Sequence, residues 1–310
     1  MVSSNLTSQS SVDGRGQIAP IVVLGEVLWD ILPDGSCLGG APLNFAVHAA
    51  RLGYQPVLIS AVGADPLGRR AVRILKRLDL LTSMVQTTRK WPTGKATVEL
   101  DPHGQPTFTI HRPAAYDALQ ITDCDLEALS RLKPAWIYYG TLFPSTPEGK
   151  ATLFRLLAVL PGATQFYDIN LRPGFEEPAL VSELLARADV VKLNESEATT
   201  VARMSGLPEK LEEFCRAGTE RFGWRAVCVT LGACGCAILN GGEFVRADGY
   251  PVPVADSVGT GDAFAAAFLH GLTEGWPAAR VAAFANRVGA IVASRVGATP
   301  EWTIAETAAL

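Results

Sequence analysis

The strongest candidate for chemistry is a glycine-containing turn near the C-terminus, in the stretch VADSVGTGDAFAAAFLHGL (254–272). Gly259 and Gly261 lead into an apolar helix, and Asp262 falls in its first turn. The N–H groups of such a turn converge with the helix N-terminus on one anion site. A carboxylate there can accept a hydroxyl proton while the N–H groups stabilise a phosphoryl group. It can equally be a helix cap, and this stretch alone leaves both interpretations open.

Other common sites are excluded by spacing. The chain contains no GxxxxGK[ST], and the GTGDAF run has Phe264 where a dinucleotide fingerprint needs a small residue. The four histidines show no metal-ligand spacing, which predicts that no zinc site is present. The six cysteines contain no C-x-x-C pair, so we expect reduced thiols in a cytoplasmic protein.

A second polar motif, LGGAPLNFAVHAARLG (38–53), has paired glycines before a predicted helix. Gly39 and Gly40 permit the close approach of a polyol, and Asn44 offers the donors and acceptors that match sugar hydroxyls. Asp30, placed at the end of the first predicted strand, can accept hydrogen bonds from two hydroxyls. Each feature alone also fits an ordinary turn, helix start or loop.

Alternating strands and helices must position these groups. We expect strands at 21–32, 56–63, 135–140, 164–170, 189–194, 225–232 and 236–240, and helices at 41–53, 66–78, 147–160, 178–188, 261–275 and 277–297. This order is typical of a mainly parallel sheet with helices on both faces. Ligands of such sheets bind at the carboxyl ends of the strands.

The segment 91–112 departs from this alternation. Two β-like runs, KATVEL (95–100) and PTFTIH (106–111), flank the turn DPHGQ (101–105) and predict a hairpin that forms a small flap. The Ser-rich residues 1–17 are predicted to form a flexible tail.

Length and composition limit the function classes. The 310 residues fit one large α/β domain or two smaller ones, and 48% hydrophobic residues can form a large core. The net charge of −4 gives no basic excess for nucleic acid. No apolar run reaches the roughly 18–20 residues of a membrane span, and the N-terminus lacks the apolar segment of a secretory signal.

Seven motifs occur in an order that resembles the PfkB (ribokinase-like) carbohydrate kinases, most closely the fructokinase branch. They are GEVLWD, LGGAPLNFAVHAARLG, ISAVGADPLG, YDINLRP, KLNESEA, VTLGACG and DSVGTGDAFAAAFLHGL. The resemblance spans Ile21 to Pro300. It implies a ribokinase-like three-layer α/β/α domain over 18–310, with a mainly parallel central sheet and a small β lid formed in part by about 91–112.

The same resemblance implies the site residues. Asp262 would be the catalytic base, Gly259, Thr260 and Gly261 the anion hole, and Arg172 a residue near phosphates and substrate. Asp30, Gly39, Gly40 and Asn44 would bind the sugar. Asn194 and Glu197 would organise Mg²⁺ through water near the ATP phosphates, Thr230 and Gly232 would bind nucleotide, and Asn286 would lie near the adenine. Asp256, Val258 and Gly297 would form a K⁺ loop. Lys192 matches no role.

The expected function is an ATP-dependent sugar kinase that phosphorylates a primary hydroxyl, with fructose to fructose 6-phosphate as the leading reaction. Kinases of the same fold acting on 2-keto-3-deoxygluconate, ribose or a nucleoside are the alternatives. A non-catalytic sugar sensor would be signalled by loss of the carboxylate at 262, which is present. A nicotinamide-dependent oxidoreductase would need GxGxxG in the first βα turn, which is absent. The expected partner is a small sugar, with a homodimer through the lid.

Overall fold

A computed structural model describes residues 20–32, 35–100 and 106–310. The predicted tail (1–17) and the predicted hairpin turn (101–105) lie outside these ranges. No helix in the described ranges is long and apolar enough to cross a membrane.

The centre of the molecule is a nine-stranded sheet with the order β13-β12-β11-β10-β9-β8-β1-β4-β5. Its strands are β1 (Ile21–Leu24), β4 (Pro56–Gly63), β5 (Val85–Thr88), β8 (Trp136–Tyr139), β9 (Thr164–Asp168), β10 (Val190–Asn194), β11 (Ala226–Thr230), β12 (Cys236–Asn240) and β13 (Glu243–Ala247). Neighbours pair in parallel except at β11–β12 and β12–β13, which are antiparallel. The mainly parallel sheet is therefore confirmed, and β5 and β13 are additions to it.

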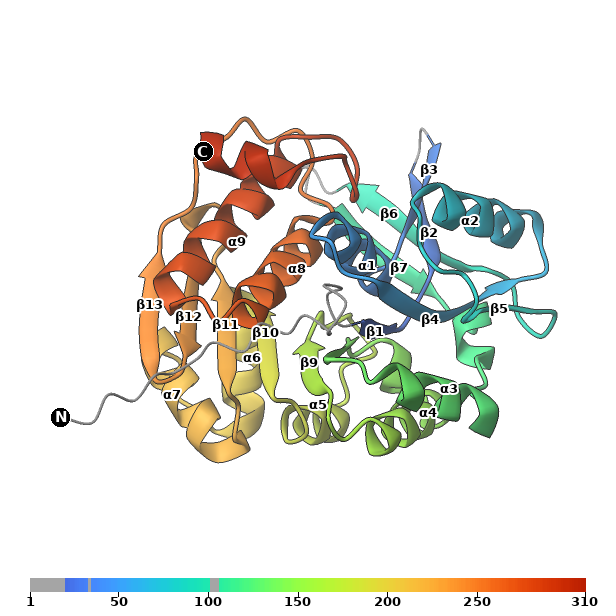
Figure 1. The fold of residues 1–310 in the computed structure, drawn as a ribbon, viewed down its shortest axis with the longest axis horizontal. Coiled ribbons are helices and arrows are strands. Elements are labelled where there is room, and N and C mark those ends of the chain that lie inside the picture. The colour runs from blue at the N-terminus through green and yellow to red at the C-terminus, as the bar shows by residue number, and fades with distance from the viewer. Residues whose placement is uncertain (1–19, 33–34, 101–105) are drawn as a thin grey trace.

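Helices cover both faces of this sheet, as Figure 1 shows. One face carries α1 (Ala41–Arg51), α2 (Pro66–Arg77), α8 (Thr260–Thr273) and α9 (Ala278–Ala293). The other carries α3 (Asp123–Leu132), α4 (Pro147–Val159), α5 (Pro178–Leu185), α6 (Glu195–Ser205) and α7 (Leu211–Phe222). Each face has its own hydrophobic core, so the expected three-layer architecture is confirmed.

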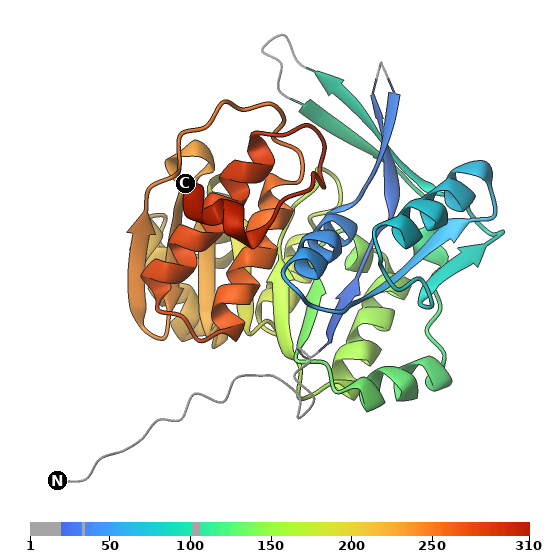
Figure 2. The ribbon, with the colours of Figure 1, turned by 45° about the horizontal axis from the view of Figure 1, so that its top comes forward.

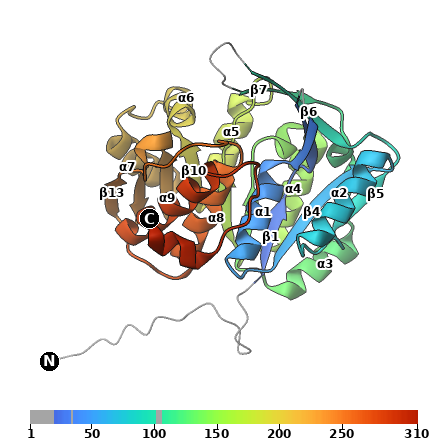
Figure 3. The ribbon, with the colours of Figure 1, turned by 90° about the horizontal axis from the view of Figure 1, so that it is seen from above.

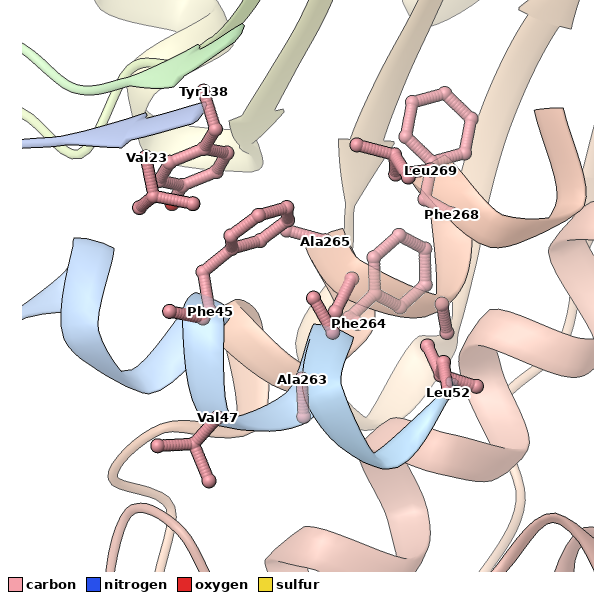
Figure 4. Close-up of a cluster of buried hydrophobic side chains, with 14 of the residues drawn as sticks. Val23, Phe45, Val47, Leu52, Tyr138, Ala263, Phe264, Ala265, Phe268 and Leu269 are labelled. Carbon is pink, nitrogen blue, oxygen red and sulfur yellow. The ribbon is translucent and has the colours of Figure 1, made fainter. Parts of the chain in front are cut away.

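Helices α1 and α8 pack side by side on the first of these faces (Figure 3). The α8 residues Ala265, Ala266 and Ala267 are fully buried, and such small side chains allow helices to approach closely. On α1, Phe45 stacks on Tyr138 of β8 with the ring centroids 3.8 Å apart. Figure 4 shows this cluster, in which α1 and α8 are anchored to the same core. The N-terminal turns of both helices are thereby fixed relative to each other.

A second, four-stranded sheet has the order β3-β2-β6-β7. Its strands are β2 (Leu28–Leu32), β3 (Gly35–Gly39), β6 (Gly94–Leu100) and β7 (Pro106–His111). The β6–β7 pair confirms the hairpin predicted within 91–112. Figure 2 shows this small sheet projecting from the main domain.

The single strand predicted over 21–32 is wrong, because the chain leaves the central sheet after Leu24 and enters the small sheet at Leu28. At the break, Gly25 packs against Pro42 of α1 so closely that a Cβ would lie 2.4 Å from the proline Cγ. Asp30 consequently lies inside β2, opposite Cys37 of β3, and not at the end of the first strand. The burial of both segments hides the break from the hydrophobic pattern.

The packing of α1 gives a stability prediction. Substitution Phe45→Ala removes a fully buried ring, and such changes cost about 3–5 kcal/mol. We expect a clearly lower urea midpoint, measured by circular dichroism. The control Leu132→Ala alters a side chain that is 46% exposed and should leave the midpoint nearly unchanged. Equal midpoints for both variants would contradict the assigned core.

Candidate active site

A cavity of about 220 Å³ lies where the small sheet faces the N-terminal turns of α1 and α8. Most of the predicted reaction and sugar-binding residues line it: Asp30, Gly40, Asn44, Arg172, Gly259, Gly261 and Asp262, together with Val258 from the predicted cation loop. Ala96 of β6 and Ile110 of β7 line its wall on the side of the small sheet. Segments more than two hundred residues apart in the sequence therefore meet at one cavity.

Asp262 is buried at the start of α8 and faces this cavity. Its Oδ2 accepts a hydrogen bond of 2.8 Å from Nδ2 of Asn44 on α1. The N-cap position of α8 is Gly259, and no side-chain capping bond is present there. Burial raises the pKa of Asp262 to about 7, and Asp168 adds to the rise, while Lys192 opposes it. The side chain therefore bonds across to α1 instead of capping its own helix.

The turn before Asp262 requires its first glycine. Gly259 has a φ of 77°, and a Cβ there would lie 2.2 Å from the carbonyl oxygen of Ala298. Thr260 begins α8 and packs its methyl group near Gly289 of α9. The first N–H groups of a helix have no partner within the helix. This turn can therefore direct donors toward an anion beside Asp262.

The paired glycines before α1 have a packing role. Gly40 has a φ of 112°, and a Cβ there would lie 2.5 Å from the carbonyl oxygen of Glu26. A Cβ at Gly39 would lie 2.4 Å from Oδ2 of Asp30. Burial raises the pKa of Asp30 to about 6, and Arg172 opposes the rise. The glycines thus allow two carboxylate-bearing segments to approach the start of α1, and only Gly40 lines the cavity.

Besides Ser257 of the glycine turn, two polar residues of the cavity wall, Glu26 and Asn170, were not singled out as site residues by the sequence. Burial raises the pKa of Glu26 to about 7, against the opposing effect of Arg172 and other groups. Asn170 has a φ of 42°, and its buried Nδ2 has no hydrogen-bond partner among the described residues. Both follow a central strand within the motifs GEVLWD and YDINLRP. If the sequence had placed the end of β1 at Leu24, Glu26 would have stood out as an acidic residue just after a central strand.

The predicted nucleotide residues lie apart from this cavity. Asn194 and Thr230 are register partners at the ends of β10 and β11, and Gly232 follows two residues later. Asn286 on α9 donates from Nδ2 to the carbonyl oxygen of Asp248 at 3.0 Å. Its amide group thus fixes the loop that contains Asp248.

Glu197 has both carboxylate oxygens engaged by the backbone. Oε1 accepts from the N–H of Leu171 at 2.9 Å, and Oε2 accepts from the N–H of Asn194 at 2.8 Å. Asn194 in turn caps the N–H of Glu197 at 2.9 Å. Among the described residues no three acidic, cysteine or histidine side chains form a metal cluster.

The three residues of the predicted cation loop meet at Asp256. Its Oδ1 accepts from the N–H of Val258 and its Oδ2 from the N–H of Gly297, both at 2.9 Å. One carboxylate thus ties the turn before α8 to the segment after α9. The three predicted residues are therefore close together, and the Asp256 carboxylate links the two loops by hydrogen bonds.

Comparison with known proteins extends this picture. Residues 36–304 match the family described as pfkB family carbohydrate kinase. The fructokinase of Klebsiella pneumoniae is 32% identical over 81% of this chain and 84% of its own. The 5-dehydro-2-deoxygluconokinase of Geobacillus kaustophilus is 28% identical over 83% of this chain and 79% of its own.

Among solved structures, the fructokinase from Vibrio cholerae O395 in its fructose, ADP and calcium ion bound form superposes with a TM-score of 0.77. It is 26% identical and covers 94% of this chain and 98% of its own. The family match spans most of the chain and includes the turn that carries Asp262. The chain belongs to the pfkB family of carbohydrate kinases.

Proposed function

We propose that this chain transfers the γ-phosphoryl group of ATP to a primary hydroxyl of fructose and forms fructose 6-phosphate. The observation that carries the proposal is the buried Asp262 carboxylate, which faces the cavity beside a glycine turn and is held by Asn44. The likeness to the fructokinases of Klebsiella pneumoniae and Vibrio cholerae supports fructose as the acceptor.

The chemical step needs a proton acceptor and stabilised charge. The sugar oxygen attacks the γ-phosphorus as the bond to the β-phosphate oxygen breaks, and ADP leaves. Asp262 takes the hydroxyl proton, which it can accept only in its ionised form. N–H groups at the start of α8 stabilise charge on the transferring group, and Arg172 supplies a positive charge at the same cavity.

Magnesium would be held mainly by the nucleotide phosphates and water, and each Glu197 oxygen keeps a lone pair that can accept a hydrogen bond from such a water. When bound, the ion neutralises phosphate charge. A K⁺ ion would bind to backbone carbonyls of the loops that Asp256 joins. The homodimer through the small sheet and the cytoplasmic location stay predictions.

The charges of the cavity favour an uncharged sugar over a sugar acid. Three carboxylates of the described wall, Glu26, Asp30 and Asp262, face one cation, Arg172. Above pH 7 this wall has a net negative charge, which repels a substrate carboxylate. The Geobacillus relative is named for a different sugar acid, 5-dehydro-2-deoxygluconate, so it supports a sugar acid as a class of acceptor and not 2-keto-3-deoxygluconate itself. Ribose and nucleosides are uncharged and are separated from fructose only by experiment.

Substitution Asp262→Asn tests the proton acceptor. We expect kcat to fall by about 10²–10⁴-fold, because the amide cannot take the proton, while calorimetric fructose affinity changes little. A coupled ADP-release assay measures kcat, with Asp123→Asn as the exposed control. Near-normal turnover in Asp262→Asn would contradict the role.

Substrate choice is tested by kcat/KM for fructose, ribose, adenosine and 2-keto-3-deoxygluconate. We expect fructose to exceed the sugar acid by at least about tenfold, a difference of about 1.4 kcal/mol. Glu26→Gln should reduce this preference by removing a negative charge, and the exposed Glu148→Gln should leave it unchanged. If wild type prefers 2-keto-3-deoxygluconate, that sugar acid takes the place of fructose as the proposed substrate.

The pH dependence follows from the buried base. Since the pKa of Asp262 is about 7 in the free protein, kcat/KM should rise about tenfold per unit below this value and level off above it. The measurement is a fructose kcat/KM profile in buffers of constant ionic strength. A profile with its midpoint near the ordinary aspartate value of 3.8 would disagree with the burial of the base.

A further inference from the structure

A buried ion pair to which the sequence motifs assign no role lies beside the turn that precedes Asp262. Nζ of Lys192, in the middle of β10, lies 3.0 Å from Oδ1 of Asp168 at the end of β9. Both side chains are almost completely buried, with 4% and 0% of their areas exposed. Oδ2 of Asp168 accepts a 2.9 Å hydrogen bond from the hydroxyl of Tyr138 on β8. Each oxygen of Asp168 therefore has a fixed donor.

The ammonium group of Lys192 lies next to the glycine turn that precedes Asp262. A Cβ built on Gly261 would lie 3.3 Å from Nζ, and Gly261 directly precedes Asp262. The charge is therefore held against the backbone of the turn that positions the proposed base. Because the surroundings are buried, this charge is weakly screened by solvent and acts strongly on its neighbours.

Other ionisable groups lie around this pair and around Asp262. Glu197 of α6 and Asp262 of α8 act on Lys192, and Arg172 from the loop after β9 acts on Asp262. The Cys228 thiol of β11 and the Tyr138 hydroxyl of β8 also face the pair. Glu26 acts on Tyr138 from beside the start of α1.

Stability alone does not account for the pair. Burying two charges costs several kcal/mol each, and apolar replacements of buried ion pairs are often neutral or stabilising. A pair placed at random would also have no reason to lie against the glycine that precedes the proposed base. Its position indicates an electrostatic role at Asp262.

We propose that the Lys192–Asp168 pair is a positioning device that holds Asp262 ready as the proton acceptor and sets the pH range of the reaction. This inference rests on the proposed kinase function. Lys192 favours the ionised form of Asp262 by its positive charge, and Asp168 limits that effect by its negative charge. Lys192 therefore acts through Asp262 and is not itself the base.

The two partners should have opposite effects. Loss of the lysine charge removes a factor that lowers the pKa of Asp262, so the acid limb of kcat/KM should move to higher pH. Loss of the Asp168 charge removes a factor that raises this pKa, so the limb should move to lower pH. A packing role predicts loss of activity without opposite shifts.

The experiment compares fructose kcat/KM profiles of wild type, Lys192→Met, Asp168→Asn and the double variant. We expect the acid limb of the Lys192→Met profile to move to higher pH by about one unit. Well below the midpoint, this appears as an extra tenfold loss of kcat/KM. Asp168→Asn should shift the limb the opposite way, and the double variant should lie close to wild type because both charges are gone. Lys192→Arg should retain the wild-type midpoint even if kcat falls.

The control is Lys150→Met, which removes a lysine from the partly exposed pair with Glu183 and should shift nothing. Circular dichroism and thermal unfolding verify folding. If Lys192→Met does not fold, Asp168→Asn and Lys192→Arg still decide the question. Unshifted profiles in folded variants, shifts in one direction for both single variants, or a uniform loss at every pH would overturn the inference.

A titration without substrate separates this inference from the proposed function. Carbon-13 NMR of labelled aspartate, assigned with Asp262→Asn, follows the Asp262 carboxyl directly. Shifted Asp262 titrations in the variants, found together with a wild type that phosphorylates no sugar, would refute the proposed function alone. An active wild type with unshifted Asp262 titrations in the folded variants would refute the inference alone.

Discussion

The site depends on one hydrogen bond, from Nδ2 of Asn44 to Oδ2 of Asp262, which joins side chains separated by 218 positions in the sequence. It holds a buried carboxylate at the cavity in a setting that disfavours its charge. A base with its pKa near neutrality is suited to accept a proton at physiological pH. The surrounding fold can be understood as the means of placing and keeping that group.

Packing supplies the required precision. The small, buried alanines of α8 allow α1 to pack closely beside it, while the Phe45–Tyr138 stack fixes α1 on the sheet. Gly259 and Gly40 let the two helix starts approach neighbouring backbone without a clash. The small sheet then closes one side of the cavity, which favours transfer to the sugar over transfer to water.

Local sequence was sufficient for the features whose cause is local. Alternating hydrophobic runs predicted the parallel sheet, and the glycine turn before an apolar run predicted the position of Asp262 at a helix start. The break after Leu24 was missed, because residues on both sides of it are buried and the pattern does not change. Lys192 and Asp168 could not be paired either, since their contact depends on the register of β9 with β10.

The most direct test is a crystal structure with fructose and a non-hydrolysable ATP analogue bound together. The account predicts a carboxylate oxygen of Asp262 within about 3 Å of the sugar's primary hydroxyl, which in turn faces the terminal phosphate. A hydroxyl bound to another group, with Asp262 separated from both sugar and nucleotide, would contradict it.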